Sequence, residues 1–333
     1  MKIEKIFIEE EARNGEIALS LPKRFPKAQV VYIDNHANIW GRVKKPYLHK
    51  RDSLNLFIAH KKGSLVKEAP DAYGISGEPH YYFIHAYNCI YECDYCYLQG
   101  YFNSPDLVLF VNHQEIMASM QEIADKTTGN LWFHAGEFSD SLALTHLTNE
   151  LSFYHDFAKR NSKCFIELRT KSANIKELMK LDPLPNFITS FSLSPKNKIK
   201  SHDLKTPSLA ARLKAIEKLY KAGHPIGLHF DPVIHTDQFE EEYQELINEV
   251  SKIIPLNKVE YISIGVVRFT KDVYSQVKKN YPKTTYFHSE LTKGEDGKIR
   301  YPRPMRHWIL GKIKDMCLKA GAIEKTVYLC MEE

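Results

Sequence analysis

A regular alternation between short apolar runs and longer stretches with helical spacing constrains the fold of this chain more than any other feature. Six runs rich in apolar and β-branched residues are typical of buried strands. They cover residues 81–85, 130–135, 164–170, 186–193, 224–230 and 261–267. Helical spacing occurs in residues 114–126, 142–159, 175–180, 209–222, 239–254 and 271–280. Six strand-then-helix units in series predict an α/β fold with a parallel sheet and helices on its outside.

A partial (β/α)6 barrel and a doubly wound sheet both satisfy this order of elements, and periodicity alone does not separate them. In both architectures the carboxyl ends of the strands carry the chemistry. We therefore expect functional side chains in the segments that directly follow the six runs.

Three parts are expected along the chain. Residues 1–80 read as a small N-terminal α/β segment with strands at 2–9, 28–33 and 54–60, and the Gly-, Pro- and charge-rich stretch 61–79 reads as a covering loop. Residues 81–285 form the barrel. Residues 286–333 form a C-terminal extension, in which glycines and prolines between 294 and 304 indicate a hairpin.

The composition excludes several classes of protein. Hydrophobic residues make up 43%, enough for a real core, and no apolar run approaches the ~18 residues of a membrane span. Acidic residues near the N-terminus stand where a signal peptide has its apolar core, and six cysteines are too few for a disulfide scaffold. We expect a cytoplasmic protein with reduced thiols. The net charge of +5 permits an anionic partner without demanding one.

Three of the six cysteines, Cys89, Cys93 and Cys96, follow the first run with the spacing Cys-x3-Cys-x2-Cys. A structural zinc ion would need a fourth protein ligand, and paired Cys-x2-Cys repeats are missing. Thiolates also hold iron–sulfur clusters, and three of them leave one iron of a four-iron cluster open to another molecule. A zinc- or cluster-bearing protein without catalysis is the competing reading.

This loop resembles the signature of the radical S-adenosylmethionine superfamily. The resemblance implies a partial (β/α)6 barrel with a 4Fe-4S cluster whose open iron binds S-adenosylmethionine. Reduction of the cluster then cleaves this cofactor to a 5′-deoxyadenosyl radical, and the protein positions it.

The chain is similar, more narrowly, to the spore photoproduct lyase family. The run 93–99 carries the resemblance, together with residues 138–140, 169–172, 191–194, 268–271 and 281–284. The family repairs DNA by abstracting hydrogen from a methylene-bridged thymine dimer and splitting it. The implied partners are DNA containing pyrimidine photoproducts and an electron donor such as flavodoxin or ferredoxin. The alternative is a radical enzyme acting on another nucleobase lesion or a small molecule.

The resemblance also assigns roles to residues. Cys89, Cys93 and Cys96 would hold the cluster. Ser139, Lys171 and Ser192 match positions that contact S-adenosylmethionine, although a solvated loop charge is the competing reading of Lys171. Tyr95 and Tyr97 match two tyrosines that relay a hydrogen atom back to the cofactor, and aromatic packing beside the cluster competes with that role.

The match breaks at Glu137, where the family has the cysteine that donates the final hydrogen atom. The O–H bond of a carboxyl group is too strong for that step. In other radical enzymes a Gly-Glu pair binds the amino group of the cofactor, and Gly136–Glu137 fits this role. A tyrosine or another thiol would then donate, Cys330 only if the tail folds over the barrel mouth. A different substrate that needs no thiol remains the other explanation.

Two further groups carry hypotheses. Basic residues beside aromatic ones suit contacts with a DNA backbone, although a solvated face is the ordinary reading of a charge run. The loop after the fourth run offers Lys196, Lys198, Lys200 and Lys205. The C-terminal extension offers Arg300, Tyr301, Arg303, Arg306 and Lys312. A second metal site is also conceivable, but hydrogen-bonded pocket histidines are favoured over it. The residues concerned are His134, His229, Asp231 and His235.

Overall fold

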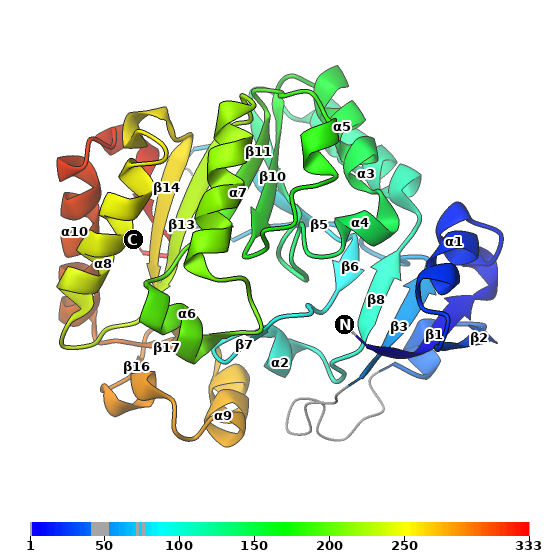
Figure 1. The fold of residues 1–333 in the computed structure, drawn as a ribbon, viewed down its shortest axis with the longest axis horizontal. Helices are drawn as coiled ribbons and strands as arrows, with labels where there is room; N and C mark the ends of the chain where they lie inside the picture. The colour runs from blue at the N-terminus through cyan, green and yellow to red at the C-terminus, as the bar shows by residue number, and fades with distance from the viewer. Residues whose placement is uncertain (1, 41–52, 71–72, 75–76, 333) are drawn as a thin grey trace.

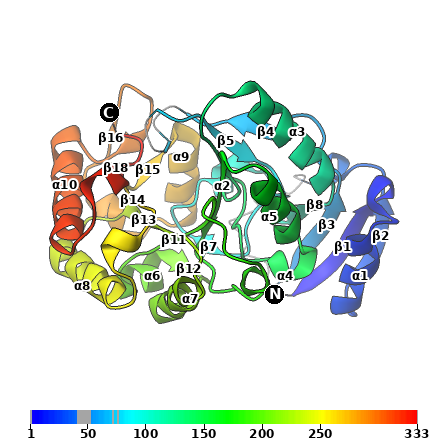
Figure 2. The same ribbon diagram turned by 90° about the horizontal axis from the view of Figure 1, so that it is seen from above.

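The fold is described from a computed structural model in residues 2–40, 53–70, 73–74 and 77–332. A large curled sheet forms one half of the molecule and a smaller sheet forms the other (Figures 1 and 2). The expected loop 61–79 lies partly outside the described residues. No helix in the described part of the chain is long and apolar enough to cross a membrane.

The curled sheet contains all six expected strands, paired in parallel in chain order. This confirms the partial barrel and excludes a doubly wound sheet, whose strand order reverses part-way. The six strands are β5 (His80–Phe83), β9 (Leu131–His134), β10 (Cys164–Thr170), β11 (Phe187–Ser192), β13 (Ile226–Val233) and β14 (Tyr261–Val266). A short antiparallel strand, β4 (Val66–Glu68), lies at the β5 edge.

A seventh parallel strand, β18 (Val327–Leu329), closes the opposite edge beside β14. The sequence alone does not reveal this strand, because three residues carry too little periodicity. Residues 327–329 therefore contribute an edge strand to the main sheet.

Helices cover the outside of the curled sheet and bury their apolar stripes against it (Figure 1). They are α3 (His113–Lys126), α5 (Leu151–Arg160), α7 (Leu209–Lys221), α8 (Phe239–Ser251) and α10 (Arg303–Lys319). The single helix expected over 142–159 is wrong: α4 (Thr145–Thr148) and α5 are separated at Asn149, which adopts a left-handed φ of 53°. The expected helix 175–180 is reduced to a 3₁₀ turn, Leu178–Lys180.

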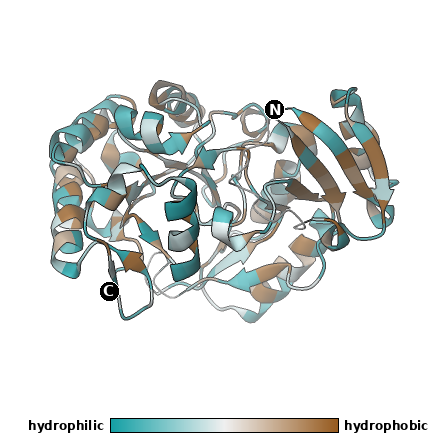
Figure 3. Ribbon diagram, turned by 90° about the horizontal axis from the view of Figure 1, so that it is seen from below, coloured by the Kyte–Doolittle hydropathy of each residue, from teal (hydrophilic) through white to brown (hydrophobic). Residues whose placement is uncertain are grey.

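The smaller sheet has the order β2-β1-β3-β8-β6 and is covered by α1 (Glu16–Arg24). Three of its strands were expected: β1 (Ile3–Glu9), β2 (Gln29–Ile33) and β3 (Leu54–Ala59). The other two, β6 (Ala86–Tyr87) and β8 (Leu107–Phe110), come from beyond residue 80. Figure 3 shows the hydrophobic residues gathered along these strands.

Short elements complete the face where the barrel strands end. These are β7 (Glu92–Cys93), α2 (Leu98–Tyr101), α6 (Lys196–His202), β12 (Asp203–Leu204), β15 (Arg268–Phe269) and α9 (Lys271–Asn280). The expected C-terminal hairpin is present as β16 (Thr292–Lys293) and β17 (Ile299–Arg300), and Gly297 supplies the positive φ of its turn.

Candidate active site

The three cysteines of the motif lie in the segment that crosses between the two sheets. The chain leaves the barrel after β5, pairs in the smaller sheet as β6, and then forms the cysteine loop up to α2. Cys93 is buried, and Cys89 and Cys96 are half-buried. Pairing of Cys93 with Asp203 in β7 and β12 fixes one side of the loop. Asn88 starts it in a left-handed conformation, with its side-chain amide donating to the carbonyl of Asp106 at 2.8 Å.

The donor set fits an iron–sulfur cluster. All three cysteines are free thiols. Burial raises the pKa of each, and the charge of Lys171 acts in the opposite direction on all three. In the described residues no three Cys, His, Asp or Glu side chains converge on a single ion. A 4Fe-4S cluster needs no such convergence, because each thiolate binds a different iron.

Asp140 ties the end of β9 to the end of β10. One carboxylate oxygen accepts from the backbone of Leu142 and Ala143 and from the hydroxyl of Thr170, at 2.7–3.1 Å. The other accepts from the backbone of Lys171 at 2.8 Å. A capped turn therefore places Lys171 beside the cysteine loop.

The residues that the resemblance assigns to S-adenosylmethionine lie at or directly after the ends of barrel strands. Gly136, Glu137 and Ser139 follow β9, Lys171 follows β10, and Ser192 ends β11. A Cβ atom at Gly136 would lie 2.8 Å from the carbonyl oxygen of Arg169, so only glycine permits this turn to pass so close to β10. The parallel strands end at one edge, and from there the charge of Lys171 acts on all three thiols.

Glu137 is held by two tyrosines. The hydroxyl of Tyr73 lies 3.3 Å from its Oε2 atom, and the hydroxyl of Tyr97 donates to its carbonyl oxygen. Burial raises the pKa of Glu137, which favours the neutral carboxyl group. Tyr97, which follows Cys96 directly, thus connects the cysteine loop to the position where the family has its cysteine.

Tyr95 has a different environment from Tyr97. Its hydroxyl donates to Asp203, whose other oxygen accepts from the buried Arg212 at 2.9 Å. Its ring lies 5.6 Å from the ammonium nitrogen of Lys171. These contacts fit a residue that positions the loop and Lys171.

The barrel contains a charged layer that the sequence alone does not reveal. Glu167, on β10, is fully buried and accepts from Arg169 at 3.1 Å, Ser190 at 2.6 Å and His229 at 2.8 Å. His134 and Tyr261 also contact its carboxylate. A glutamate inside an otherwise apolar run was the available signal, because a buried carboxylate requires partners.

The four residues weighed as a second metal site do not converge. His134 and His229 belong to the Glu167 layer. Asp231 pairs in bidentate fashion with Arg268, at 3.0 and 2.9 Å. The ring of His235 instead packs against Phe239 and Trp308. The favoured reading, hydrogen-bonded pocket histidines, describes His134 and His229.

The C-terminal basic residues are placed differently from the expectation of an exposed surface. Tyr301 is fully buried, and its hydroxyl accepts from the backbone of His235 at 3.1 Å. Arg300 and Arg306 are buried ion-pair partners of Glu332. Lys312 pairs with Glu240 at 3.0 Å, and Arg303 is exposed. Charge patterning alone does not reveal such partners.

The other basic cluster is also largely paired. Lys196 contacts Glu245 and Glu249, Lys198 is buried against Glu242, and Lys205 contacts Glu92. Lys200 is exposed.

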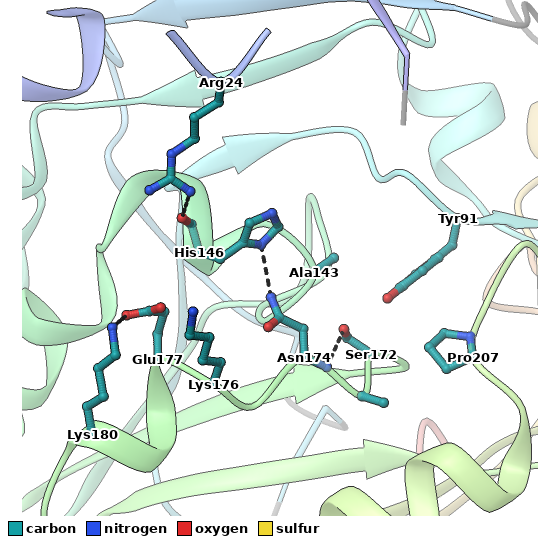
Figure 4. A pocket seen from close by; sticks show the side chains of 11 residues that line it. Arg24, Tyr91, Ala143, His146, Ser172, Asn174, Lys176, Glu177, Lys180 and Pro207 are labelled. Atoms are coloured by element: carbon teal, nitrogen blue, oxygen red, sulfur yellow. Dashed lines mark hydrogen bonds and ion pairs between the residues drawn. The ribbon is translucent and has the colours of Figure 1, made fainter. Parts of the chain in front are cut away.

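A pocket of about 620 Å³ lies on the side of the cysteine loop that faces α1 (Figure 4). Arg24, His146, Lys176 and Lys180 line it, and Glu177 is paired with Lys180. Tyr91, from the cysteine loop, forms part of its wall. Its backbone N–H lies 3.4 Å from the sulfur of Cys89, so the pocket wall touches the proposed cluster ligand.

Comparison with known proteins gives a consistent result. The family model "Spore photoproduct lyase" matches residues 75–305. A spore photoproduct lyase of Bacillus subtilis (strain 168) is 31% identical over 208 residues, which cover 60% of this chain and 59% of the relative. One of Geobacillus sp. (strain Y412MC61) is 29% identical over 205 residues, 60% of each chain. The match thus spans about 60% of the length of these curated relatives.

The fold extends the likeness over nearly the whole chain. A solved spore photoproduct lyase double mutant with bound AdoMet and dinucleoside spore photoproduct superimposes with a TM-score of 0.83 at 20% identity, covering 99% of both chains. Another spore photoproduct lyase, complexed with the dinucleoside spore photoproduct, gives 0.82 at 20% identity and 98% coverage of both. At this identity the likeness establishes a common fold.

Proposed function

This chain belongs to the spore photoproduct lyase family, and from that premise we propose that it is a radical S-adenosylmethionine lyase that repairs a thymine photoproduct in DNA. The observation that carries the proposal is the meeting of three free thiols, Lys171 and the ends of β9, β10 and β11 at the barrel mouth. The relatives' bound AdoMet and dinucleoside photoproduct support the same cofactor and substrate class.

The chain's own residues divide the work. The bound cluster and S-adenosylmethionine supply a carbon radical that abstracts hydrogen from the lesion. Cys89, Cys93 and Cys96 would hold the cluster, and the ammonium group of Lys171 would pair with the carboxylate of the cofactor. Gly136, Glu137, Ser139 and Ser192 line the same edge and orient the cofactor. Side chains inside the curled sheet, such as Glu167 and His229, are fully buried, and a site closed to water would protect a radical from side reactions.

We also propose that DNA contacts Arg303 and Trp308, which lie in the first two turns of α10. Both are exposed, and Trp308 is 44% accessible. Arginine suits phosphate contacts, and an exposed indole suits stacking on a base.

The proposed location of the protein is the cytoplasm, because its reducing conditions suit an oxygen-sensitive cluster.

Repair of irradiated DNA tests the function directly. Reconstituted, dithionite-reduced protein is incubated without oxygen with S-adenosylmethionine and UV-irradiated DNA. We expect 5′-deoxyadenosine and repaired thymines above a no-enzyme control, both measured by mass spectrometry. Deoxyadenosine without repair would move the substrate to another lesion or a small molecule. No cofactor cleavage by a fully loaded cluster would remove the enzyme hypothesis.

The electron donor is proposed to dock over the basic pocket beside Tyr91. Cations outnumber acids around this pocket, and its wall contacts the loop that binds the cluster. An acidic one-electron donor such as a flavodoxin or ferredoxin would be attracted there, with a strong dependence on salt. Arg24, on α1, and Lys176 lie at the pocket and are exposed.

Reversing the charge of this pocket tests docking of the electron donor independently of the cleavage of S-adenosylmethionine. In the variant Arg24→Glu/Lys176→Glu, we expect cofactor cleavage driven by a flavodoxin to fall about tenfold at low salt, because the association rate of an electrostatically steered complex falls when the charge is reversed. Cleavage driven by dithionite should stay unchanged, because dithionite needs no docking. Lys214→Glu/Lys218→Glu, which reverses two exposed charges on α7, is the matched control. An equal loss with both reductants would contradict the docking surface.

A further inference from the structure

Splitting the dimer leaves an unpaired electron on a thymine carbon, and a hydrogen atom must reach that carbon. Glu137 occupies the family's donor position, and its O–H bond is too strong to supply one. A thiol has a weak S–H bond and is the ordinary protein source. Three cysteines hold the cluster, and Cys164 and Cys317 are buried in the core at the start of β10 and within α10.

The structure brings the remaining thiol, Cys330, to the barrel mouth. It directly follows β18, and its backbone N–H donates to the carbonyl of Ile264 at 2.8 Å. Its side chain is buried inward, with the sulfur 3.5 Å from Arg268 and 3.9 Å from the carbonyl oxygen of Tyr73. The hydroxyl of the same Tyr73 lies 3.3 Å from Glu137. One tyrosine therefore spans the distance between the thiol and the family's donor position.

A buried clamp fixes the tail in this place. Glu332 accepts from Arg306 at 2.9 and 3.1 Å and from Arg300 at 3.1 Å, and Arg300 also donates to the carbonyl of Met331 at 2.9 Å. Charge-assisted pairs of this kind hold geometry as well as adding energy. The neighbouring pair Asp231–Arg268 packs against Gly265, where a Cβ atom would lie 2.8 Å from the carboxylate. The Cys330 thiol is therefore held in a fixed position at the wall of the site and does not lie on a loose tail.

We propose that Cys330 is the hydrogen-atom donor that completes the lyase reaction, a role that rests on the proposed function. The S–H bond breaks homolytically, its hydrogen forms a C–H bond on the released thymine, and the unpaired electron stays on sulfur. Tyr73 and Tyr97, which both contact Glu137, provide the return path. One hydrogen atom leaves the lesion for the cofactor at the start, and one returns from the cofactor to sulfur. The cycle needs no outside oxidant or reductant.

Replacing the thiol separates this role from the rest of the reaction. For Cys330→Ala, we expect repaired thymine per protein to fall about tenfold or more while cofactor cleavage continues. Cys317→Ala, which removes an equally buried thiol from α10, is the control and should repair as the wild type does. Equal repair by wild type and Cys330→Ala overturns the donor assignment. A wild type that cleaves cofactor but releases no thymine overturns the proposed function instead.

Moving the thiol back to the family's position gives a gain of function. In the double variant Glu137→Cys/Cys330→Ala, we expect repair to return in part, which a merely structural role of Cys330 would not produce.

Discussion

Replacing Cys93 by Ala is expected to abolish the brown colour of the reconstituted protein and all cleavage of S-adenosylmethionine. Cys93 is the most buried of the three cluster cysteines, and β7–β12 pairing fixes its backbone. A methyl group cannot bind iron, and the two remaining thiolates cannot hold a four-iron cluster with one open iron. Iron and sulfide analysis with absorption and electron paramagnetic resonance spectra measures the loss.

A matched variant tests whether the loss of the cluster is specific to the cysteine motif. Cys164→Ala removes another fully buried thiol, at the start of β10 and away from the mouth. It should keep a full complement of iron, although the cavity it leaves lowers stability. A Cys93→Ala protein that retained a complete 4Fe-4S cluster would contradict the ligand assignment.

The parts of the site that the sequence predicts are those set by local spacing. The cysteine loop is one short segment, so its chemistry is visible without a fold. Lys171 and Ser192 directly follow buried strands, and the parallel sheet brings such ends to one edge. The strands themselves were predictable because burial on both faces makes each a continuous apolar run.

The parts that escape prediction depend on partners far apart in the chain. Arg300 and Arg306 read as an exposed basic surface, yet both bind Glu332. Cys330 reaches the mouth only because β18 pairs with β14. The local periodicity of the sequence predicts neither the ion pairs with Glu332 nor the pairing of β18 with β14. The same tail contacts support the proposal that Cys330 supplies the thiol that the family places at the position of Glu137.

Glu167→Gln is expected to lower the free energy of unfolding by about 3–5 kcal/mol, as the loss of one partner from a buried ion pair does. The amide leaves Arg169 without its counter-charge and cannot satisfy His134 and His229 together. Urea unfolding at pH 7.5 measures the change. Glu10→Gln, an exposed acid paired with Arg13, should cost less than about 1 kcal/mol. Similar losses in both variants would contradict a special role for the buried layer.

Acid unfolding gives the same layer a pH signature. Burial lowers the pKa of His229 to about 4, so between pH 6.5 and 4 the unfolded chain binds a proton that the folded one does not. As the pH falls over that range, wild-type stability should therefore decrease, and His85 and His113, whose pKa values burial lowers to about 4 and about 3, should add to the decrease. Burial opposes ionisation of Glu167, but Arg169 and His134 outweigh it and hold its pKa well below the ordinary value of 4.5. The stability that ionised Glu167 gives the folded protein is fully present above pH 4.5 and is lost only at lower pH. Glu167→Gln should remove this second loss, and a wild-type profile flat from pH 6.5 to 4 would contradict a neutral, buried His229.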